Sequence, residues 1–488
     1  MIFVIIGSGV LALAAAVLLR AVIHTPAKEM VEPPAEIALD AKALSTHLLQ
    51  AIRMQTIPHG DREGYLGEDF AFLHELFETD FPLVHSTLSR EKVWEYSLLY
   101  TWKGLDERLK PILLMGHLDV VPSELSGEDG PSLSGYDGHI SGNYIWGKGA
   151  QDDKYAVLGM LEAVEKLLKD GFTPRRTVYL AFGHDEEIGG QGGAFHIGTL
   201  LHARGVELEY VLDEGPPITE HILPGISRPV ALVGIAEKGN RYIELSVEVE
   251  PGHPVIPHQD PAISILSNAL YKLAQNPFPA RFEKPVRQMF RSLLPRMPFG
   301  DRILFANLWL FDPVIRRKLS ALPRTNTLIR TIAVPTMFKA GSDGNTLPAK
   351  AQAMINLRLL PHDNFHEVLK RVELIINDPR VRIKPLDELT VENTMVSGTD
   401  STGYRTIEWT IRQVFPETLV APGLFISETD SRYLAPLTAS IFRFSPLKLR
   451  PESLQRYVHG KEEKISIEDY VQAVKFYLQL IRNSDSLE

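Results

Sequence analysis

The chain has 488 residues and a formal net charge of -10, and 44% of its residues are hydrophobic. Such a chain can bury a large core and should form more than one domain, and its acidity argues against nucleic acid as a partner. Cysteine is absent, which excludes disulfides and thiolate metal ligands but fits either an oxidising or a reducing compartment.

The first predicted element is an uncharged, mostly apolar run of 18 residues from Ile2 to Leu19. As a helix it would be about 27 Å long, close to the thickness of the hydrocarbon core of a bilayer. It predicts a hydrophobic signal anchor over residues 1–24, or an uncleaved signal peptide, followed by a proline-containing linker over residues 25–43. Arg20 and Lys28 follow the run and no basic residue precedes it, which opposes export of the C-terminal side.

The first part of an α/β domain is predicted over residues 44–236. Its apolar run from Pro111 ends at His117, as a buried parallel strand does when it delivers a side chain to the C-terminal edge of a sheet. Asp119 follows two residues later, so in an extended chain its carboxylate faces the same way and can fix the tautomer of the imidazole. Taken alone, the pair could equally be a satisfied polar contact at a strand end.

The same pattern recurs twice further along the chain. The β-rich run from Thr177 to Gly183 is followed by an acidic cluster that contains Glu186 and Glu187, and the run from Leu208 to Leu212 is followed by Asp213. In open α/β sheets, ligands bind at the carboxyl ends of the strands. Glycines beside the glutamates, at positions 189, 190, 192 and 193, indicate that the backbone there is packed closely against another group.

Residues 237–392 have a separate, α+β pattern. Periodicity gives strand, helix, strand, strand, helix and strand. The predicted ranges are 241–250, 262–274, 327–336, 351–360, 365–377 and 381–386.

Within that range, residues 276–326 form a long insertion. Between Arg281 and Lys318 it carries nine Arg or Lys against three acids, and aromatic residues such as Phe290, Trp309 and Phe311 are interleaved. Such a segment could line an acyl-chain channel or lie on an anionic membrane surface, or it could be an extra helical pair packed on the rest of that range.

The α/β domain is predicted to resume over residues 393–488. It contains His459, and Ser466 is expected to cap a final helix that runs to about Ile481 and docks on the sheet. This docking would hold the loop that carries His459 in place.

A charge count favours two metal ions at the edge of the sheet. With His117 and His459 neutral, the carboxylates of Asp152, Glu187 and Asp213 and one bridging hydroxide carry four negative charges, which two divalent cations balance. Carboxylate and imidazole ligands without cysteine suit zinc, with manganese or cobalt as substitutes. Glu186 is then left over, so it can act as the general base for a metal-activated water.

These motifs resemble the aminoacylase and carboxypeptidase S family of dinuclear zinc metallopeptidases, from about Leu44 to the C-terminus. Within the family the chain is most similar to the N-fatty-acyl-amino-acid synthase/hydrolase branch. The resemblance is carried by the segments 115–122, 147–154, 183–190, 211–215, 338–341, 429–433 and 457–465.

The resemblance implies that His117, Asp152, Glu187, Asp213 and His459 bind two zinc ions, that Asp119 supports His117, and that a cis peptide follows Asp152. It implies a catalytic domain with a mixed, largely parallel sheet flanked by helices, and a ferredoxin-like lid that is inserted over residues 237–392 and dimerises. In the family the lid sends a His into the site of the partner, and the matching residue is His253, although Pro254, Val255 and Ile256 then replace the small residues that are common there. Asn345 and Arg358 match a pair that holds the substrate.

The predicted activity is hydrolysis, and by reversibility formation, of N-acyl amino acids through a metal-bound hydroxide, with a long fatty acyl chain favoured. A carboxypeptidase or dipeptidase with the same site is the first alternative, and a catalytically inactive, membrane-tethered binding protein is the second. The resemblance also implies a membrane-anchored or secreted protein whose catalytic domain is extracytoplasmic, against the charge pattern around the N-terminal run.

Overall fold

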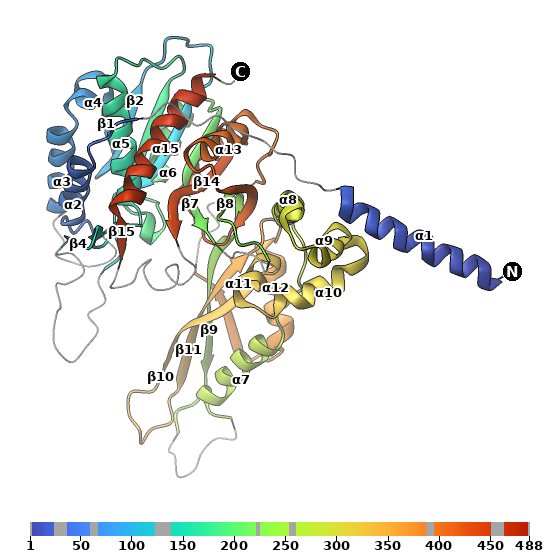
Figure 1. Cartoon of the computed structure of the whole chain (residues 1–488). Coiled ribbons are helices and arrows are strands. Elements are labelled where there is room, and N and C mark those ends of the chain that lie inside the picture. Colours follow the sequence, from blue (N-terminus) through green and yellow to red (C-terminus); the bar gives the residue numbers. More distant parts are fainter. Residues whose placement is uncertain are drawn as a thin grey trace.

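A computed structural model describes residues 2–23, 37–58, 67–122, 138–220, 225–252, 260–386, 395–449 and 463–486. The predicted residues His253 and His459 lie outside these ranges. The chain forms a large α/β domain, a smaller sheet domain beside it, and a long N-terminal helix that projects from the body (Figure 1).

The large domain is built on an eight-stranded sheet with the order β1-β2-β6-β3-β7-β14-β8-β13. Its centre, β6-β3-β7-β14, is parallel, β1 and β2 are antiparallel, and β8 and β13 run parallel to each other but antiparallel to β14. The predicted mixed, largely parallel sheet is therefore confirmed. The strands are β1 (Ser89–Val93), β2 (Ser97–Trp102), β3 (Ile112–His117), β6 (Val178–Gly183), β7 (Tyr210–Thr219), β8 (Val230–Glu237), β13 (Leu419–Phe425) and β14 (Ile441–Leu449).

Helices cover both faces of this sheet. One face packs against α2 (Ala41–Ile52), α3 (Glu68–Asp80), α4 (Pro82–Thr87), α5 (Lys154–Lys169), α13 (Thr402–Val414) and α15 (Ile467–Ser486). The other face packs against α6 (Ala194–Ala203) and the 3-10 turn η4 (Asp430–Leu434). A small sheet, β15-β5-β4, consists of β4 (His139–Ser141), β5 (Tyr144–Trp146) and β15 (Lys464–Ser466).

The predicted C-terminal helix is α15. The Asp469 N–H donates to Ser466 Oγ at 3.0 Å, which confirms the predicted cap. Tyr470, Val474 and Phe476 are buried because they lie on the face that packs on the sheet.

The smaller domain, the lid, is an antiparallel sheet with the order β10-β11-β9-β12 and two helices that share one core with it. Five of its six elements lie close to the predicted ranges, but the strand expected from Thr327 begins at Ile332, because Pro323 starts a short helix that extends to Ile329. The elements are β9 (Gly239–Glu248), α7 (Ala262–Gln275), β10 (Ile332–Ala340), β11 (Lys350–Leu359), α12 (Phe365–Ile376) and β12 (Val381–Pro385).

The insertion forms more than the expected helical pair, and it does not pack on the lid alone. Its apolar side shares a core with Val230 and Leu232 of β8 and with Ala421 and Leu424 of β13. The insertion therefore covers the large sheet at the edge formed by these two strands. Its elements are α8 (Lys284–Leu293), η3 (Leu294–Arg296), α9 (Phe299–Ala306), α10 (Leu308–Ser320) and α11 (Pro323–Ile329).

The N-terminal apolar run forms α1 (Ile2–Ile23), which lies against α9 at its C-terminal end (Figure 1). Among the residues whose side chains the structure describes, no helix combines the length and the apolar character needed to cross a membrane.

Candidate active site

β3 delivers His117 to the carboxyl edge of the large sheet, where its side chain is buried. Its Nδ1 lies 3.0 Å from the main-chain oxygen of Asp119 and 3.3 Å from Asp119 Oδ1, and its Nε2 lies 2.9 Å from Asp152 Oδ1. Because both acceptors at Nδ1 favour a proton there, Nε2 is left to face Asp152 and the cavity.

The carboxylate of Asp119 also fixes the loop that follows β6. It accepts the N–H of Glu186 at 3.2 Å and the N–H of Glu187 at 3.0 Å. The predicted supporting residue therefore orients both the imidazole and the two glutamates, which lie in the 3-10 turn η2 (Glu186–Ile188).

Asp152 lies in the turn that precedes α5, and the expected cis peptide is present between Asp152 and Asp153. The turn is held by Glu463, whose Oε1 accepts the N–H of Gln151 at 2.8 Å and the N–H of Asp152 at 3.3 Å. Burial raises the pKa of Glu463 to about 8. Glu463 was not predicted as a site residue, although it lies four residues after the predicted ligand His459 in the sequence.

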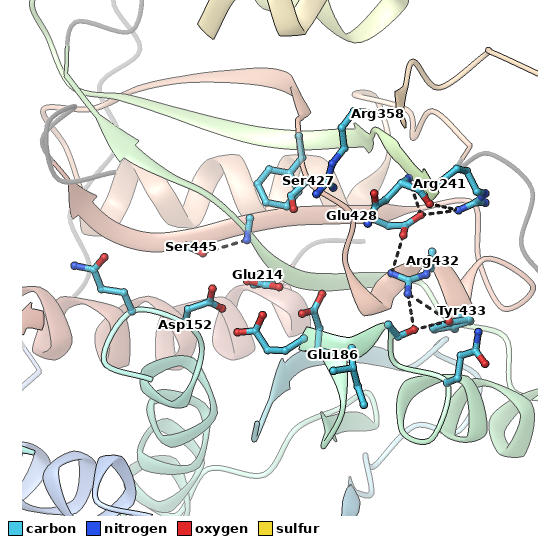
Figure 2. Close-up of a pocket in the computed structure, with 18 of the residues that line it drawn as sticks. Asp152, Glu186, Glu214, Arg241, Arg358, Ser427, Glu428, Arg432, Tyr433 and Ser445 are labelled. Carbon is cyan, nitrogen blue, oxygen red and sulfur yellow. Dashed lines mark hydrogen bonds and ion pairs between the residues drawn. The ribbon is translucent and has the colours of Figure 1, made fainter. Parts of the chain in front are cut away.

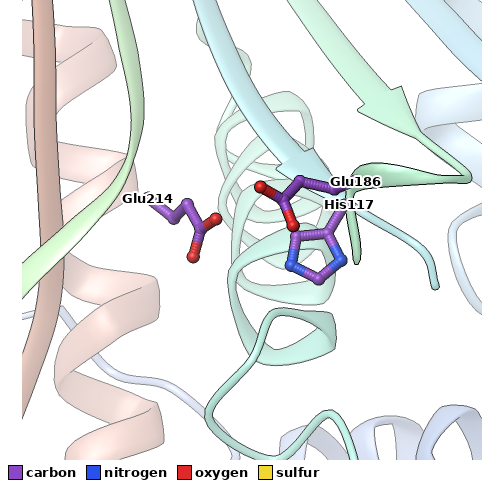
Figure 3. Close-up of side chains that lie close together, drawn as sticks. All are labelled: His117, Glu186 and Glu214. Carbon is purple, nitrogen blue, oxygen red and sulfur yellow. The ribbon is translucent and has the colours of Figure 1, made fainter. Parts of the chain in front are cut away.

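Two groups of side chains bring their possible ligand atoms within 4.8 Å of one another: His117 with Glu186 and Glu214, and His117 with Asp152 and Glu187. Figure 3 shows the first group, with the three side chains turned toward a common space. The structure therefore gathers the predicted ligands His117, Asp152 and Glu187 and the predicted base Glu186.

The strand β7 carries two adjacent carboxylates, the predicted ligand Asp213 and Glu214. Asp213 is buried, its Oδ1 accepts the N–H of Glu214 at 2.9 Å and its Oδ2 accepts the N–H of Ser431 at 2.8 Å. Neither of the two clusters includes Asp213, whereas Glu214 belongs to one and lines the cavity. Neighbouring residues of a strand point to opposite sides, so the two carboxylates do not face the same space.

The charges of this cluster oppose one another. Burial and the carboxylates of Asp152 and Glu186 raise the pKa of Glu214 well above its ordinary value, and burial likewise raises the pKa of Glu186. Although burial disfavours the imidazolium, Asp119 and Asp152 raise the pKa of His117. A divalent cation between these groups would relieve the repulsion, and imidazole nitrogen with carboxylate oxygen is a donor set that zinc accepts.

Gly190, one of the glycines beside Glu187, lies against Asp430, for which no role was predicted. The Asp430 carboxylate is buried against the loop, and a Cβ on Gly190 would collide with its Oδ1, while a Cβ on Gly183 would lie 2.7 Å from its Oδ2. Gly190 also has a φ of +66°. The predicted close contact of the backbone at Gly190 is therefore a contact with η4, which packs against the loop that carries the glutamates.

The cluster forms one wall of a cavity of about 890 Å³ between the large domain and the lid. Figure 2 shows Asp152, Glu186 and Glu214 on one side and Arg358, Arg241 and Glu428 on the other. The cavity is also lined by Arg432, Tyr433 and the apolar residues Ile188, Pro217, Leu386, Phe425, Leu447 and Leu449.

Two of the three arginines in this cavity share one acid. Glu428 lies 3.4 Å from Arg241 and 3.6 Å from Arg432. Arg358, the predicted holder of the substrate, donates through Nε to Asn356 Oδ1 at 3.0 Å, and the ion pairs found among the described residues do not include it.

Asn345, the predicted companion of Arg358, is not brought to this cavity. It is exposed in the connection between β10 and β11, where its N–H donates to Asp343 Oδ1 at 2.8 Å. Leu347 donates its N–H to the Gly252 oxygen at 2.9 Å, so this connection lies beside the backbone that leads to His253.

Residues 113–483 match the family described as Peptidase family M20/M25/M40. The chain belongs to this family. Probable carboxypeptidase S-like 2 of Dictyostelium discoideum is 42% identical over 446 residues, which cover 91% of this chain and 85% of the relative. N-fatty-acyl-amino acid synthase/hydrolase PM20D1 of Mus musculus is 38% identical over 450 residues, which cover 91% and 88%.

A solved structure, the M20 family metallo-carboxypeptidase Sso-CP2 from Sulfolobus solfataricus, superposes with a TM-score of 0.64 at 16% identity, over 92% of this chain and 100% of that chain. The resemblance inferred from the motifs is confirmed. The protein is an enzyme of a metal-dependent family and acts on amide bonds.

Proposed function

We propose that this enzyme hydrolyses, and by reversibility forms, the amide bond of N-acyl amino acids, with a long acyl chain favoured. The observation that supports this best is the cavity itself, which places a wall of carboxylates and an imidazole opposite an arginine that no described acid neutralises. An N-acyl amino acid carries one free carboxylate beside its amide bond, so it matches both walls.

Arg358 is the residue proposed to hold that carboxylate. Arg241 and Arg432 already face Glu428, whereas Arg358 donates to the Asn356 amide and forms no ion pair within the described part of the chain. A guanidinium binds a carboxylate through two parallel N–H donors, which fixes the orientation of the substrate as well as its position.

The acyl chain is proposed to lie along the apolar part of the cavity. Pro217 of β7 and Leu447 and Leu449 of β14 line the cavity together with Leu386 and Phe425. Ser445 lies across Glu214 from the arginines in Figure 2, so β14 continues away from the carboxylate-binding end. This separation suits a substrate that is charged at one end and apolar at the other.

Glu186 is proposed as the general base. It would take the proton of the attacking water and pass it to the amide nitrogen as the carbon–nitrogen bond breaks, which leaves a carboxylate and an amine. The proposed ligands are His117, Asp152, Glu187, Glu214 and His459, holding two zinc ions, with manganese or cobalt as substitutes. When bound, such cations supply polarisation of the carbonyl and a lower pKa for water.

A second copy of the chain is proposed to complete the site. Gly252, which precedes His253 in the sequence, pairs with Leu347 in the connection that carries Asn345, and neither Gly252 nor Asn345 lines the cavity of its own chain. The edge strand β10 exposes Val334, Met337 and Phe338, which is a surface that another lid could cover. In a homodimer, His253 would stabilise the oxyanion in the partner's site.

Attachment to a membrane through the N-terminal segment and an extracytoplasmic catalytic domain belong to the same proposal. The apolar composition of α1 supports the attachment to a membrane. The absence of cysteine favours neither an oxidising nor a reducing compartment.

The test compares oleoyl-phenylalanine, oleoyl-phenylalanine amide and a simple dipeptide, using the full chain loaded with zinc. We expect oleoyl-phenylalanine to be turned over best. Arg358→Met should reduce kcat/KM for it by about 10- to 100-fold, the value of a hydrogen bond to a charged group, but should leave the amide almost unaffected.

Arg382→Met is the matched control, because Arg382 is an exposed lid arginine on β12 outside the cavity lining. A clear preference for the dipeptide would overturn the acyl assignment in favour of a carboxypeptidase or dipeptidase, the activity that the name of the Dictyostelium relative carries.

A further inference from the structure

The insertion over α8 to α11 is basic and aromatic, and the sequence left three interpretations of it open. No residue of the insertion lines the described cavity, so it does not form the acyl-chain channel there. Its inner side packs on the large sheet through residues such as Phe290 and Ile315. The question is what its outer side meets.

The outer side of α10 is one continuous face. Its exposed residues recur at helical spacing and are apolar in the first half and basic in the second: Trp309, Leu310, Pro313, Val314, Arg317 and Lys318. Trp309 is 58% exposed and Val314 is 56% exposed. The buried side of the same helix carries Ile315 and Leu319, so α10 is apolar on two opposite faces and only one of them is covered by protein.

The acids of the insertion offset one of the two basic charges of this face and leave Arg317 without an ion pair among the described residues. Asp301 pairs with Lys318 at 2.7 Å, Asp312 pairs with Arg316, and Glu283 pairs with Arg281. The exposed face of α10 itself contains no acid. It therefore complements a surface that is apolar inside and negatively charged outside.

The helix α1 continues this face. The buried Asn307 amide donates to the Val17 oxygen at 3.1 Å, and the Arg20 guanidinium lies 5.6 Å from the centre of the Trp309 ring. Beyond this contact α1 projects from the body beside α9 and α10 (Figure 1). It exposes Leu11, Leu13, Leu18, Leu19, Val22 and Ile23, and Phe299 at the start of α9 is exposed as well.

We propose that the outer face of α10, with Phe299 and the exposed side of α1, binds a lipid surface with anionic head groups. Trp309, Leu310 and Val314 enter the boundary of the acyl chains while Arg20 and Arg317 meet head-group phosphates. An acidic protein partner would satisfy the arginines but leave the leucines of α1 in water. The inference goes beyond an N-terminal anchor, since it places a specific face of the folded enzyme against the lipid, and it does not depend on the identity of the substrate.

The absence of cysteine makes a direct test possible. A single cysteine in place of Val314, labelled with an environment-sensitive fluorophore, reports contact of α10 with lipid in the full chain. Leu105→Cys is the matched control, because Leu105 is 74% exposed in the large domain, between β2 and β3. The vesicles are phosphatidylcholine with and without phosphatidylserine.

We expect the label at position 314 to shift to shorter wavelength with phosphatidylserine vesicles and the label at position 105 to stay unchanged. Arg317→Gln should weaken partitioning by about fivefold, the effect of one basic charge near an anionic surface. Arg382→Gln, on the lid, should not change partitioning.

Two outcomes overturn the proposal. If the protein floats with the vesicles while the label at position 314 keeps its value in water, α1 alone holds the protein and the face of α10 points elsewhere. If the label responds without vesicles and in proportion to protein concentration, a second copy of the chain covers this face.

Discussion

The two walls of the cavity carry opposite charges: carboxylates predominate on one wall and arginines on the other. On the wall formed by the large domain, Asp152, Glu186, Glu187 and Glu214 converge on His117. Burial, together with the repulsion of the neighbouring carboxylates, raises the pKa values of Glu186 and Glu214. On the opposite wall, Arg241 and Arg432 converge on Glu428 and share its single negative charge.

The difference indicates which ligand each wall requires. A cluster of acids that is held together by the fold without matching cations is stable only with added positive charge, so the wall of acids predicts metal. Two arginines that share one acid keep a net positive charge, and Arg358 adds to it, so this wall favours an anion such as a substrate carboxylate. The wall of acids therefore favours a cation and the wall of arginines favours an anion. The amide bond of the substrate would lie between the two.

Replacement of Glu186 by Gln should have the largest effect on activity. The variant keeps the size of the side chain and its N–H bond to Asp119 but removes the proton acceptor. We expect kcat to fall by about 10²- to 10⁴-fold with bound metal unchanged, measured by steady-state kinetics and by elemental analysis of the same preparation.

Ser445→Ala is a suitable control, because Ser445 lines the same cavity and its Oγ accepts the Gly215 N–H. It should lose far less activity than Glu186→Gln. Unchanged turnover in Glu186→Gln would remove Glu186 from the chemistry and revive the interpretation of a binding protein without catalysis.

The second prediction separates the two neighbouring carboxylates of β7. Glu214→Gln should lower metal affinity more than Asp213→Asn, because Asp213 acts through the backbone of Glu214 and Ser431. Supporting contacts of this kind are worth about 10- to 100-fold in affinity. Metal titration followed by calorimetry measures both variants.

Removal of metal provides an independent readout on stability. Metal at 100 times its Kd stabilises the native state by about 2.7 kcal/mol, and a chelator should remove this gain from the parent enzyme. In Glu214→Gln the gain should be much smaller, whereas Asp213→Asn should keep most of it. The opposite order would restore Asp213 as the ligand.

The contrast between Asp213 and Glu214 also shows where the sequence is informative. The apolar runs that end at His117, at Glu187 and in the segment Asp213–Glu214 were enough to place the site at the edge of a largely parallel sheet. Which of two adjacent acids faces the cavity depends on the pleat of β7, which a shift of one residue reverses.

Contacts between distant segments could not be predicted from the sequence for a related reason. Asp430 against Gly190, and Glu463 against the Asp152 turn, are satisfied only when the chain is folded. The insertion was recognised from its composition, but an apolar face does not specify its neighbour, and the helices packed on β8 and β13.

A third, smaller effect concerns Lys238, which lies in the link between β8 and β9 that joins the two walls. Its side chain is fully buried, and Nζ donates to the oxygens of Thr327 at 3.0 Å and Arg330 at 2.8 Å. Burial lowers the pKa of Lys238 from 10.5 to about 7. Unlike the arginines of the lid wall, this cation is accommodated by partial loss of its proton.

The sign of the pH dependence follows from this shift. Between the folded pKa near 7 and the unfolded pKa of 10.5, the unfolded chain binds more protons, so the contribution of Lys238 to stability rises with pH and is lost as the pH falls toward 7. The free energy of unfolding of the parent minus that of Lys238→Met should therefore increase by up to about 1.4 kcal/mol per pH unit in this window. Lys384→Met, an exposed lysine of β12, should give a flat difference in the same urea titrations. A flat difference for Lys238→Met as well would mean that water reaches this ammonium, and the link between the walls would then be looser than its buried contacts indicate.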